Sequence, residues 1–187
     1  MLQYNKDIGA RAVVAASRFI GLTELKSNAV WDKASTPGHD DIADELRATM
    51  LRTGWQLSWP YCAAFCEAVW RDAYQGHKEL ETVKSMLTPG CLVSWNNALK
   101  LGWTSKTPQV GAIGIMRKGD TTLGHAFIVR GVRGSTLLTI EGNTSAAGSV
   151  GVEADRNGDG VYAKTRELTF KPSTSLHLVG FILPCTE

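Results

Sequence analysis

Apolar residues recur at helical spacing through the first hundred positions of the chain. The pattern predicts a first helix over about residues 7–21, in which Val13, Val14, Ser17 and Ile20 fall near helical spacing and which Gly21 ends. Three further helices are expected: over "IADELRATMLRTGW" with Asp40 or Asp41 as its cap, over an amphipathic segment that Ser58 or Trp59 opens and Gln75-Gly76 ends, and over "SWNNALKLGW".

From Pro108 onward the apolar spacing changes to two, which is typical of strands. Turn residues separate five short runs: "VGAIGIM", "GHAFIVRGV", "TLLTIEG", "VYAKTRELTF" and "LVGFIL". Helices followed by strands indicate an α+β fold, with N-terminal helices packed on an antiparallel meander of about five or six strands. Because the sequence shows no repeat and no linker, we expect a single domain over residues 1–187.

Composition excludes some classes of function. The 187 residues are 43% apolar, enough for a core, and the net charge of +2 comes from scattered Lys and Arg, which argues against nucleic acid as a partner. No segment reaches the roughly 18 apolar residues of a membrane span. The N-terminal segment reads as an amphipathic helix rather than a signal peptide. We therefore expect a monomer made in the cytoplasm, without membrane insertion.

The four cysteines are expected to be free thiols: Cys62, Cys66, Cys91 and Cys185. The first two share one helix and are badly aimed to bridge each other, and a cytoplasm keeps thiols reduced. The chain has no CxxC and no histidine pair at ligand spacing, so zinc is not expected. "DRNGDG" at 155–160 matches the first half of an EF-hand loop, but Arg166 stands where that loop needs a glutamate, so it predicts a turn. No cofactor is expected.

Cys62 is the candidate nucleophile in "WPYCAAFCEAVW", residues 59–70. It follows Pro60 by two positions and so lies in the opening turn of the predicted helix. The helix dipole and unpaired N–H groups there favour a thiolate and lower the pKa of a thiol. Cys66 lies one turn further along among apolar residues, where a structural cysteine is expected.

His125 is the candidate base among the four histidines. His39 and His77 are expected to face solvent, and His177 begins the last strand. His125 opens the run "GHAFIV" directly after a glycine, where the first side chain of a strand can project from the rim of a sheet into a cleft.

The following strand supplies a group to orient the imidazole. If the two strands form a hairpin with a three-residue loop at 133–135, Asn143 falls opposite His125 and Glu141 lies diagonally across on the same face. A loop longer or shorter by one residue would move both to the other face. Either side chain can hold the imidazole as the third member of a triad does.

The motifs "WPYCAAF", "GHAFIV" and "IEGNTS" resemble those of the CHAP family, cysteine- and histidine-dependent amidohydrolases and peptidases found in phage endolysins and wall-remodelling enzymes. The segments "ARAVVAASRFIGLTELKSN" and "NGDGVYAKTRE" resemble the flanking sequences of phage-type members. The resemblance extends over about residues 10–170.

The resemblance implies a papain-like fold and an amide of peptidoglycan as substrate. It implies Cys62 as nucleophile, His125 as general base and Glu141 as the orienting group, with Asn143 as a competitor or supporting residue. Gln56 matches the position of an oxyanion-hole glutamine in papain-like enzymes. The backbone N–H of Cys62 is the other expected oxyanion donor, and the better supported one.

Aromatic residues near these motifs are expected to line the substrate cleft, namely Trp59, Tyr61 and Trp103. Some members of the family bind calcium through acidic residues just before the cysteine. "TGWQLSWPY" has none, so no calcium site is expected there.

The resulting hypothesis is an endolysin-like peptidoglycan hydrolase that a holin or a secretion system delivers to the wall. Without a wall-binding module, it would target thin, accessible peptidoglycan. Three alternatives stay open: an interbacterial toxin with the same chemistry, a non-catalytic wall-binding or virion module, and a cysteine enzyme acting on protein amides. The sequence does not distinguish an amidase from an endopeptidase.

Overall fold

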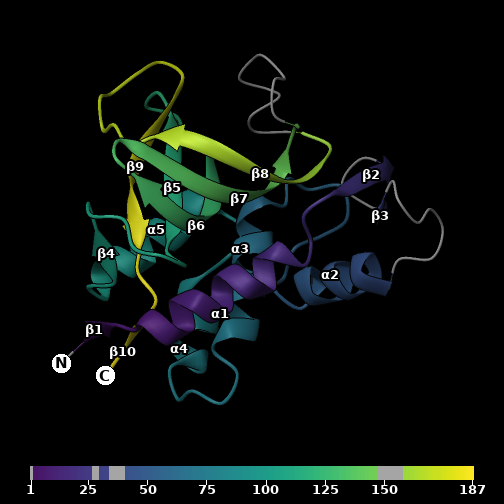
Figure 1. Ribbon diagram of the computed structural model, residues 1–187, viewed down its shortest axis with the longest axis horizontal. Helices are drawn as coiled ribbons and strands as arrows, with labels where there is room; N and C mark the ends of the chain where they lie inside the picture. The colour runs from purple at the N-terminus through teal and green to yellow at the C-terminus, as the bar shows by residue number, and fades with distance from the viewer. Residues whose placement is uncertain (1, 27–29, 34–40, 147–157) are drawn as a thin grey trace.

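The computed structural model describes residues 2–26, 30–33, 41–146 and 158–187. Within these residues the chain folds into five helices gathered on one side of a curved antiparallel sheet (Figure 1), which confirms the predicted α+β class. The helices are α1 (Lys6–Ser17), α2 (Asp41–Leu51), α3 (Cys62–Ala73), α4 (Leu80–Met86) and α5 (Cys91–Lys100). None of the helices in the described ranges has the length and apolar character needed to cross a membrane.

The main sheet has eight strands in the order β3-β2-β8-β7-β6-β5-β9-β4. The strands are β2 (Leu22–Lys26), β3 (Val30–Lys33), β4 (Thr104–Ser105), β5 (Ile113–Lys118), β6 (Gly124–Arg133), β7 (Thr136–Thr144), β8 (Gly160–Glu167) and β9 (Leu176–Ile182). The five predicted runs are its five middle strands. The sheet is larger than the expected five or six strands, because β2, β3 and β4 extend it. Its order also departs from a simple meander, because β9 pairs with β5 instead of β8.

A second, two-stranded sheet joins the ends of the chain. β1 (Gln3–Tyr4) pairs antiparallel with β10 (Cys185–Thr186), so the two termini lie side by side (Figure 1). The Asn5 side chain caps α1 just after this sheet by accepting from the N–H groups of Asp7 and Ile8.

α1 ends at Ser17, four residues before the predicted end. The N–H groups of Phe19 and Ile20 bond to carbonyls three residues back, and Gly21 adopts a φ of +93° that leads into β2. The apolar spacing also did not identify the buried side of the helix. Val14 is 67% exposed, and small residues at other positions face the core.

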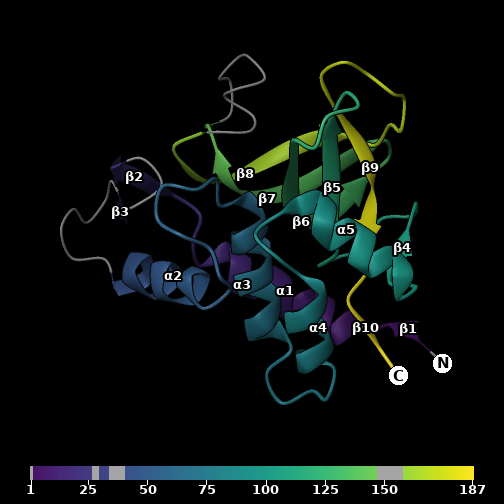
Figure 2. The ribbon, with the colours of Figure 1, turned by 180° about the vertical axis from the view of Figure 1, so that it is seen from behind.

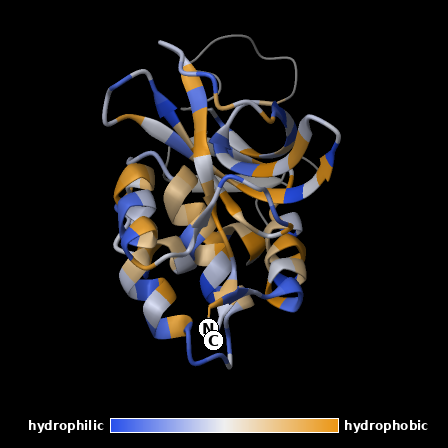
Figure 3. Ribbon diagram, turned by 90° about the vertical axis from the view of Figure 1, so that its left-hand side faces the viewer, coloured by the Kyte–Doolittle hydropathy of each residue, from blue (hydrophilic) through white to orange (hydrophobic). Residues whose placement is uncertain are grey.

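α3 is the central helix and is buried on nearly every side. Its neighbours are α1, α2 and α4, and β6 and β7 cover its remaining side. The prediction of an amphipathic helix was therefore wrong. The outer helices, in contrast, carry both hydrophilic and hydrophobic residues (Figure 3).

α3 begins later than predicted, at Cys62 itself. Tyr61 occupies the cap position, and Pro60 lies outside the helix rather than in its first turn. Ser58 has a φ of 72°, in the left-handed region, so the chain turns sharply there instead of opening the helix. The late start places the thiol of Cys62 at the first helical position.

The hairpin of β6 and β7 differs from the predicted one and yet reaches the predicted register. Arg133 pairs with Thr136, so the loop has two residues instead of three. A bulge at Arg130 then inserts one residue into β6, and Ile128 pairs with Ile140. This is the predicted register, because the bulge compensates for the shorter loop. The pairing with β6 ends at Ile140, and β7 is irregular after Glu141, so the predicted position of Asn143 opposite His125 stays a prediction.

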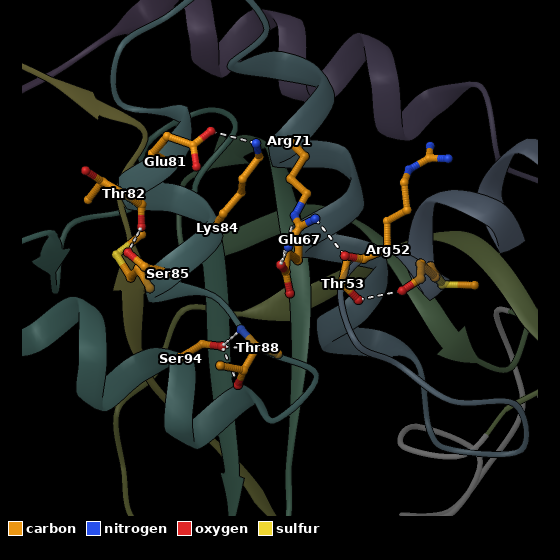
Figure 4. Close-up of polar contacts among 12 residues, drawn as sticks. Arg52, Thr53, Glu67, Arg71, Glu81, Thr82, Lys84, Ser85, Thr88 and Ser94 are labelled. Atoms are coloured by element: carbon orange, nitrogen blue, oxygen red, sulfur yellow. Dashed lines mark hydrogen bonds and ion pairs between the residues drawn. The ribbon is translucent and has the colours of Figure 1, made fainter.

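Glu67 places a carboxyl group inside the helical layer, with 1% of its surface exposed. Arg71 donates to Glu67 Oε1 through Nε and Nη2, at 3.0 and 2.6 Å, and to the carbonyl of Arg52 through Nη1 (Figure 4). Burial raises the pKa of Glu67 to about 7, against the opposing effect of Arg71.

This raised pKa predicts a pH-dependent loss of stability. The folded protein binds the Glu67 proton more tightly than the unfolded chain does, so the stabilisation is complete below pH 4.5 and is lost as the pH rises through about 7. Between pH 5 and pH 8 the free energy of unfolding of the unmodified protein should therefore fall, and Glu67 should account for up to about 3 kcal/mol of this fall. We expect the Glu67→Gln variant to lack that contribution. Urea unfolding at both pH values measures it.

The matched control for this test is Glu81→Gln, which removes an exposed carboxylate paired with Lys84 on α4. The free energy of unfolding of this variant should depend on pH as that of the unmodified protein does. An unchanged dependence in Glu67→Gln as well would contradict the proposed protonation of Glu67.

Candidate active site

Three side chains from three different elements meet at one end of α3. Cys62 begins the helix, His125 is the second residue of β6, and Glu141 lies near the end of β7. His125 and Glu141 are fully buried, while Cys62 keeps 6% of its surface exposed. The sequence predicted all three, and the structure brings them together.

His125 connects the other two groups. Its Nε2 lies 2.8 Å from Glu141 Oε2. The imidazole is also near enough to the Cys62 thiol for each group to shift the pKa of the other. Nε2 is taken by the carboxylate, and the buried Nδ1 has no hydrogen-bond partner among the described residues, so it is the ring nitrogen left for the thiol. The thiol, imidazole and carboxylate thus lie in sequence in a buried environment.

The electrostatics of this chain favour a charged pair. Burial raises the pKa of the Cys62 thiol, but the hydrogen bond and charge of His125, with backbone hydrogen bonds from Ala126 and Ala63, outweigh it and lower the pKa. Burial lowers the pKa of His125, and its contacts with Cys62 and Glu141 reverse this and raise it to about 9. Both shifts stabilise a thiolate beside an imidazolium.

Glu141 is held by two residues that sequence reasoning missed. Thr139 Oγ1 donates to Oε1 at 2.6 Å, and Arg166 donates through Nε to Oε1 at 2.9 Å and through Nη2 to Oε2 at 2.6 Å. Burial alone would raise the pKa of Glu141, but the bonds and charges of His125 and Arg166 hold it far below its ordinary value. The carboxylate therefore stays ionised.

These two residues differ in how far the sequence could have revealed them. Thr139 precedes Glu141 by two positions in a strand, so the alternation of side chains already places both on one face. Arg166 is on β8, where it pairs with Leu137 rather than with Glu141. Its long side chain has to extend along the sheet to reach the carboxylate, which no spacing in the sequence indicates.

The EF-hand-like segment gives no metal site in the described residues. Residues 155–157 of "DRNGDG" lie outside them, so the predicted turn stays a prediction. The described ranges contain no group of His, Cys, Asp and Glu that could hold a metal ion. Arg166, which departs from the EF-hand pattern, binds Glu141 instead.

Cys66 has the opposite electrostatic environment to Cys62. Burial raises the pKa of its thiol strongly, and the nearby Cys62, Glu141 and Cys91 raise it further. Cys66 thus keeps its proton. All four cysteines are free and buried, and among them the structure distinguishes Cys62 as the thiol in contact with an imidazole.

Asn143 lies two residues beyond Glu141 and is fully buried, with a left-handed φ of 57°. Its carbonyl accepts the N–H of Gly158, while the carboxylate beside the imidazole is that of Glu141. Gly142, between them, allows β7 to approach α3, since a Cβ there would lie 2.8 Å from Phe65 Cγ. This close approach brings Glu141 to the end of α3.

The aromatic residues expected to line a cleft have different environments. Trp59 is 45% exposed just before Cys62 and is available to a ligand. Tyr61 is fully buried and packs edge-on against Trp55, so it supports the loop instead of lining a cleft. Trp103 packs against Tyr74, beyond the far end of α3, and the prediction that it lines the cleft was wrong.

Gln56 is exposed in the loop before α3, and its carbonyl accepts the N–H of Trp59. Its role in an oxyanion hole stays a prediction. The backbone N–H of Cys62 is at the first position of α3, where the helix itself supplies no acceptor.

Comparison with known proteins agrees with this geometry. The sequence model of the CHAP domain family matches residues 52–143, a segment that contains Cys62, His125 and Glu141 and ends before Arg166. No curated protein matches the chain. The chain therefore carries a CHAP domain, and in residues 52–143 it belongs to that family.

Proposed function

We propose that this protein is an endolysin-like enzyme that hydrolyses an amide of peptidoglycan, with Cys62 as nucleophile, His125 as general base and acid, and Glu141 as the orienting group. A CHAP domain implies amidase or peptidase activity of the peptidoglycan-hydrolase type. The observation that supports the residue roles best is the buried 2.8 Å contact between His125 and Glu141, on the side of the imidazole away from the thiol.

In the first step the Cys62 thiolate attacks the carbonyl carbon of the scissile amide. A carbon–sulfur bond forms, and the carbonyl electron pair moves onto oxygen. The backbone N–H of Cys62 can donate to this oxyanion, since it lies at the start of α3. The positive end of the helix dipole favours negative charge at the same place.

His125 then completes the acyl transfer. Its imidazolium donates a proton to the leaving amine, the carbon–nitrogen bond breaks, and a thioester remains on Cys62. A water molecule attacks the thioester while His125 accepts its proton. The carbon–sulfur bond breaks, which releases the carboxylic acid and restores the thiolate and imidazolium.

Glu141 fixes the orientation of the imidazole in every step. An ionised carboxylate next to Nε2 keeps a proton on that nitrogen and leaves Nδ1 to exchange its proton with the thiol. Arg166 and Thr139 in turn hold Glu141 in place and ionised. We assign Arg166 as a positioning residue, because it acts through Glu141.

Purified sacculi test the proposal. We expect the unmodified protein to release soluble fragments and the folded Cys62→Ala variant to release none, because only the former can form the thioester. Mass spectrometry of the fragments would also identify the bond, since an amidase frees the whole stem peptide and an endopeptidase cuts within it. If the folded unmodified protein releases nothing, the proposed activity is wrong.

A further inference from the structure

A groove of about 560 Å³ runs between α5, the end of β5 and β9. In Figure 2, α5 lies across the sheet in front of β5 and β6, with β9 and β4 beside it. Its lining includes Cys91, Trp95, Lys106, Arg117 and Phe170. We call it the α5 groove.

The α5 groove begins next to the catalytic histidine. Cys91, the first residue of α5, lines it and packs against Gly124, where an added Cβ would lie 2.7 Å from Cys91 Sγ. Gly124 directly precedes His125. The groove therefore begins one residue along β6 from the proposed base.

Two cations in the groove are fixed by neutral partners. Lys106 Nζ donates to the carbonyl of Val179 at 2.5 Å and lies 4.8 Å from the centre of the Phe170 ring. Arg117 donates to the carbonyls of Asp120 and Thr121 at the turn after β5. These contacts hold both side chains in place and leave their positive charges uncompensated.

Carboxylates are missing from the groove lining. No Asp or Glu among the described residues lines it, and within those ranges neither cation forms an ion pair with the chain. The α5 groove thus carries net positive charge from Lys106 and Arg117.

The groove also has an apolar part, beside polar residues that include Asn96, Thr122 and His177. Trp95 lies directly on β9 because Gly180 has no side chain, and a Cβ there would lie 2.4 Å from the indole ring. Phe170 packs edge-on against Phe181 of β9. Val93 is 54% exposed on the α5 side. An extended peptide with small apolar side chains and free carboxylates matches this combination.

We propose that the α5 groove binds the stem peptide of peptidoglycan next to the scissile amide, and that Lys106 and Arg117 pair with its free carboxylates. Stem peptides are rich in alanine and carry free carboxylates, which gives the complementarity in size and charge. The inference rests on the proposed function and adds to it the part of the substrate that is recognised.

The test is a binding measurement on the full-length Cys62→Ala protein, which does not depend on hydrolysis. The probes are a soluble stem tetrapeptide with free carboxylates and the same peptide with its carboxylates amidated, titrated by calorimetry. We expect the acidic peptide to bind at least about fivefold more tightly, and Lys106→Gln with Arg117→Gln to abolish that preference. Lys100→Gln is the matched control, because Lys100 is exposed on α5 outside the groove.

Each outcome decides between the proposals. If the unmodified protein digests sacculi but both peptides bind equally, or the double variant keeps the preference, the groove assignment is wrong and the hydrolase proposal stands. If the preference is present without digestion, the groove is supported and the hydrolase proposal fails. If replacing Arg117 disturbs the β5–β6 turn, two measurements still test the groove assignment. One is the preference of the Cys62→Ala protein for the acidic peptide, and the other is the loss of that preference in Lys106→Gln alone.

Discussion

Cys62→Ala is expected to lower the rate of peptidoglycan hydrolysis by at least about 10⁴-fold, whereas Cys66→Ala should keep it within about twofold. The two thiols are one helical turn apart on α3 and both are buried. Only Cys62 has its pKa lowered by an imidazole, while burial raises that of Cys66 strongly. The pair thus separates a reactive thiol from a packing residue in the same helix.

The Cys66→Ala variant is also the control for folding. Removing a buried sulfur costs about 1 kcal/mol through lost packing, so this variant should melt at a slightly lower temperature. Digestion of sacculi, followed as loss of turbidity, measures the rate, and thermal unfolding shows whether each variant is folded. A folded but inactive Cys66→Ala protein, together with an active Cys62→Ala protein, would exchange the roles of the two cysteines.

Labelling with iodoacetamide gives an independent measure of the same difference. A thiolate reacts and a thiol does not, so the lowered pKa of Cys62 predicts that it is modified first near neutral pH. Equal and slow labelling of both residues would instead favour a wall-binding module that has no need of a reactive thiol.

The sequence predicts local features of this protein better than long-range ones. The apolar periodicity located the five middle strands, and the residues around Cys62 and His125 placed both in the site. In the β6–β7 hairpin two errors of the prediction compensated for each other. The predicted loop was one residue longer than the real one, and the bulge at Arg130 was not predicted. A bulge depends on how neighbouring strands twist and pack, so it leaves no clear mark in the sequence.

Trp103 and Arg166 show two ways in which the prediction from the sequence failed: a predicted place at the cleft that the structure does not show, and a contact in the site that was not predicted. Trp103 was predicted at the cleft because it is an aromatic residue near the motifs in sequence, yet it packs beyond the far end of α3. Arg166 is 25 residues from Glu141 and binds it with two hydrogen bonds. Both follow from how the strands are ordered across the sheet, which local periodicity does not determine.

The second large effect is expected for Glu141→Gln, which should lower kcat about 10³-fold. Arg166 would attract the amide oxygen, which turns the amide N–H group toward Nε2 of His125. The imidazole would then carry its proton on Nδ1, facing the thiol, and could not accept the thiol proton. Initial rates on sacculi at saturating substrate measure the change.

The pH profile distinguishes this orienting role from a structural one. The imidazolium of His125 is lost as the pH rises through about 9, so activity should fall there. Glu141 is one of the two groups that raise this pKa. In Glu141→Gln the alkaline fall should therefore move to lower pH, whereas a variant that is merely less stable would keep the position of this limb and lose only amplitude.

Arg166→Gln is the matched comparison, because it removes the support of Glu141 and leaves the carboxylate next to His125. We expect about a tenfold loss of rate, an unmoved alkaline limb and a loss of about 3 kcal/mol in unfolding free energy, since a buried carboxylate loses its charged partner. Arg166→Lys should recover part of the stability but little of the rate, because an ammonium cannot form the two-pronged contact. If Glu141→Gln retains both its rate and its alkaline limb, the imidazole is oriented by another group, and the buried Asn143, two residues further along β7, becomes the residue to replace.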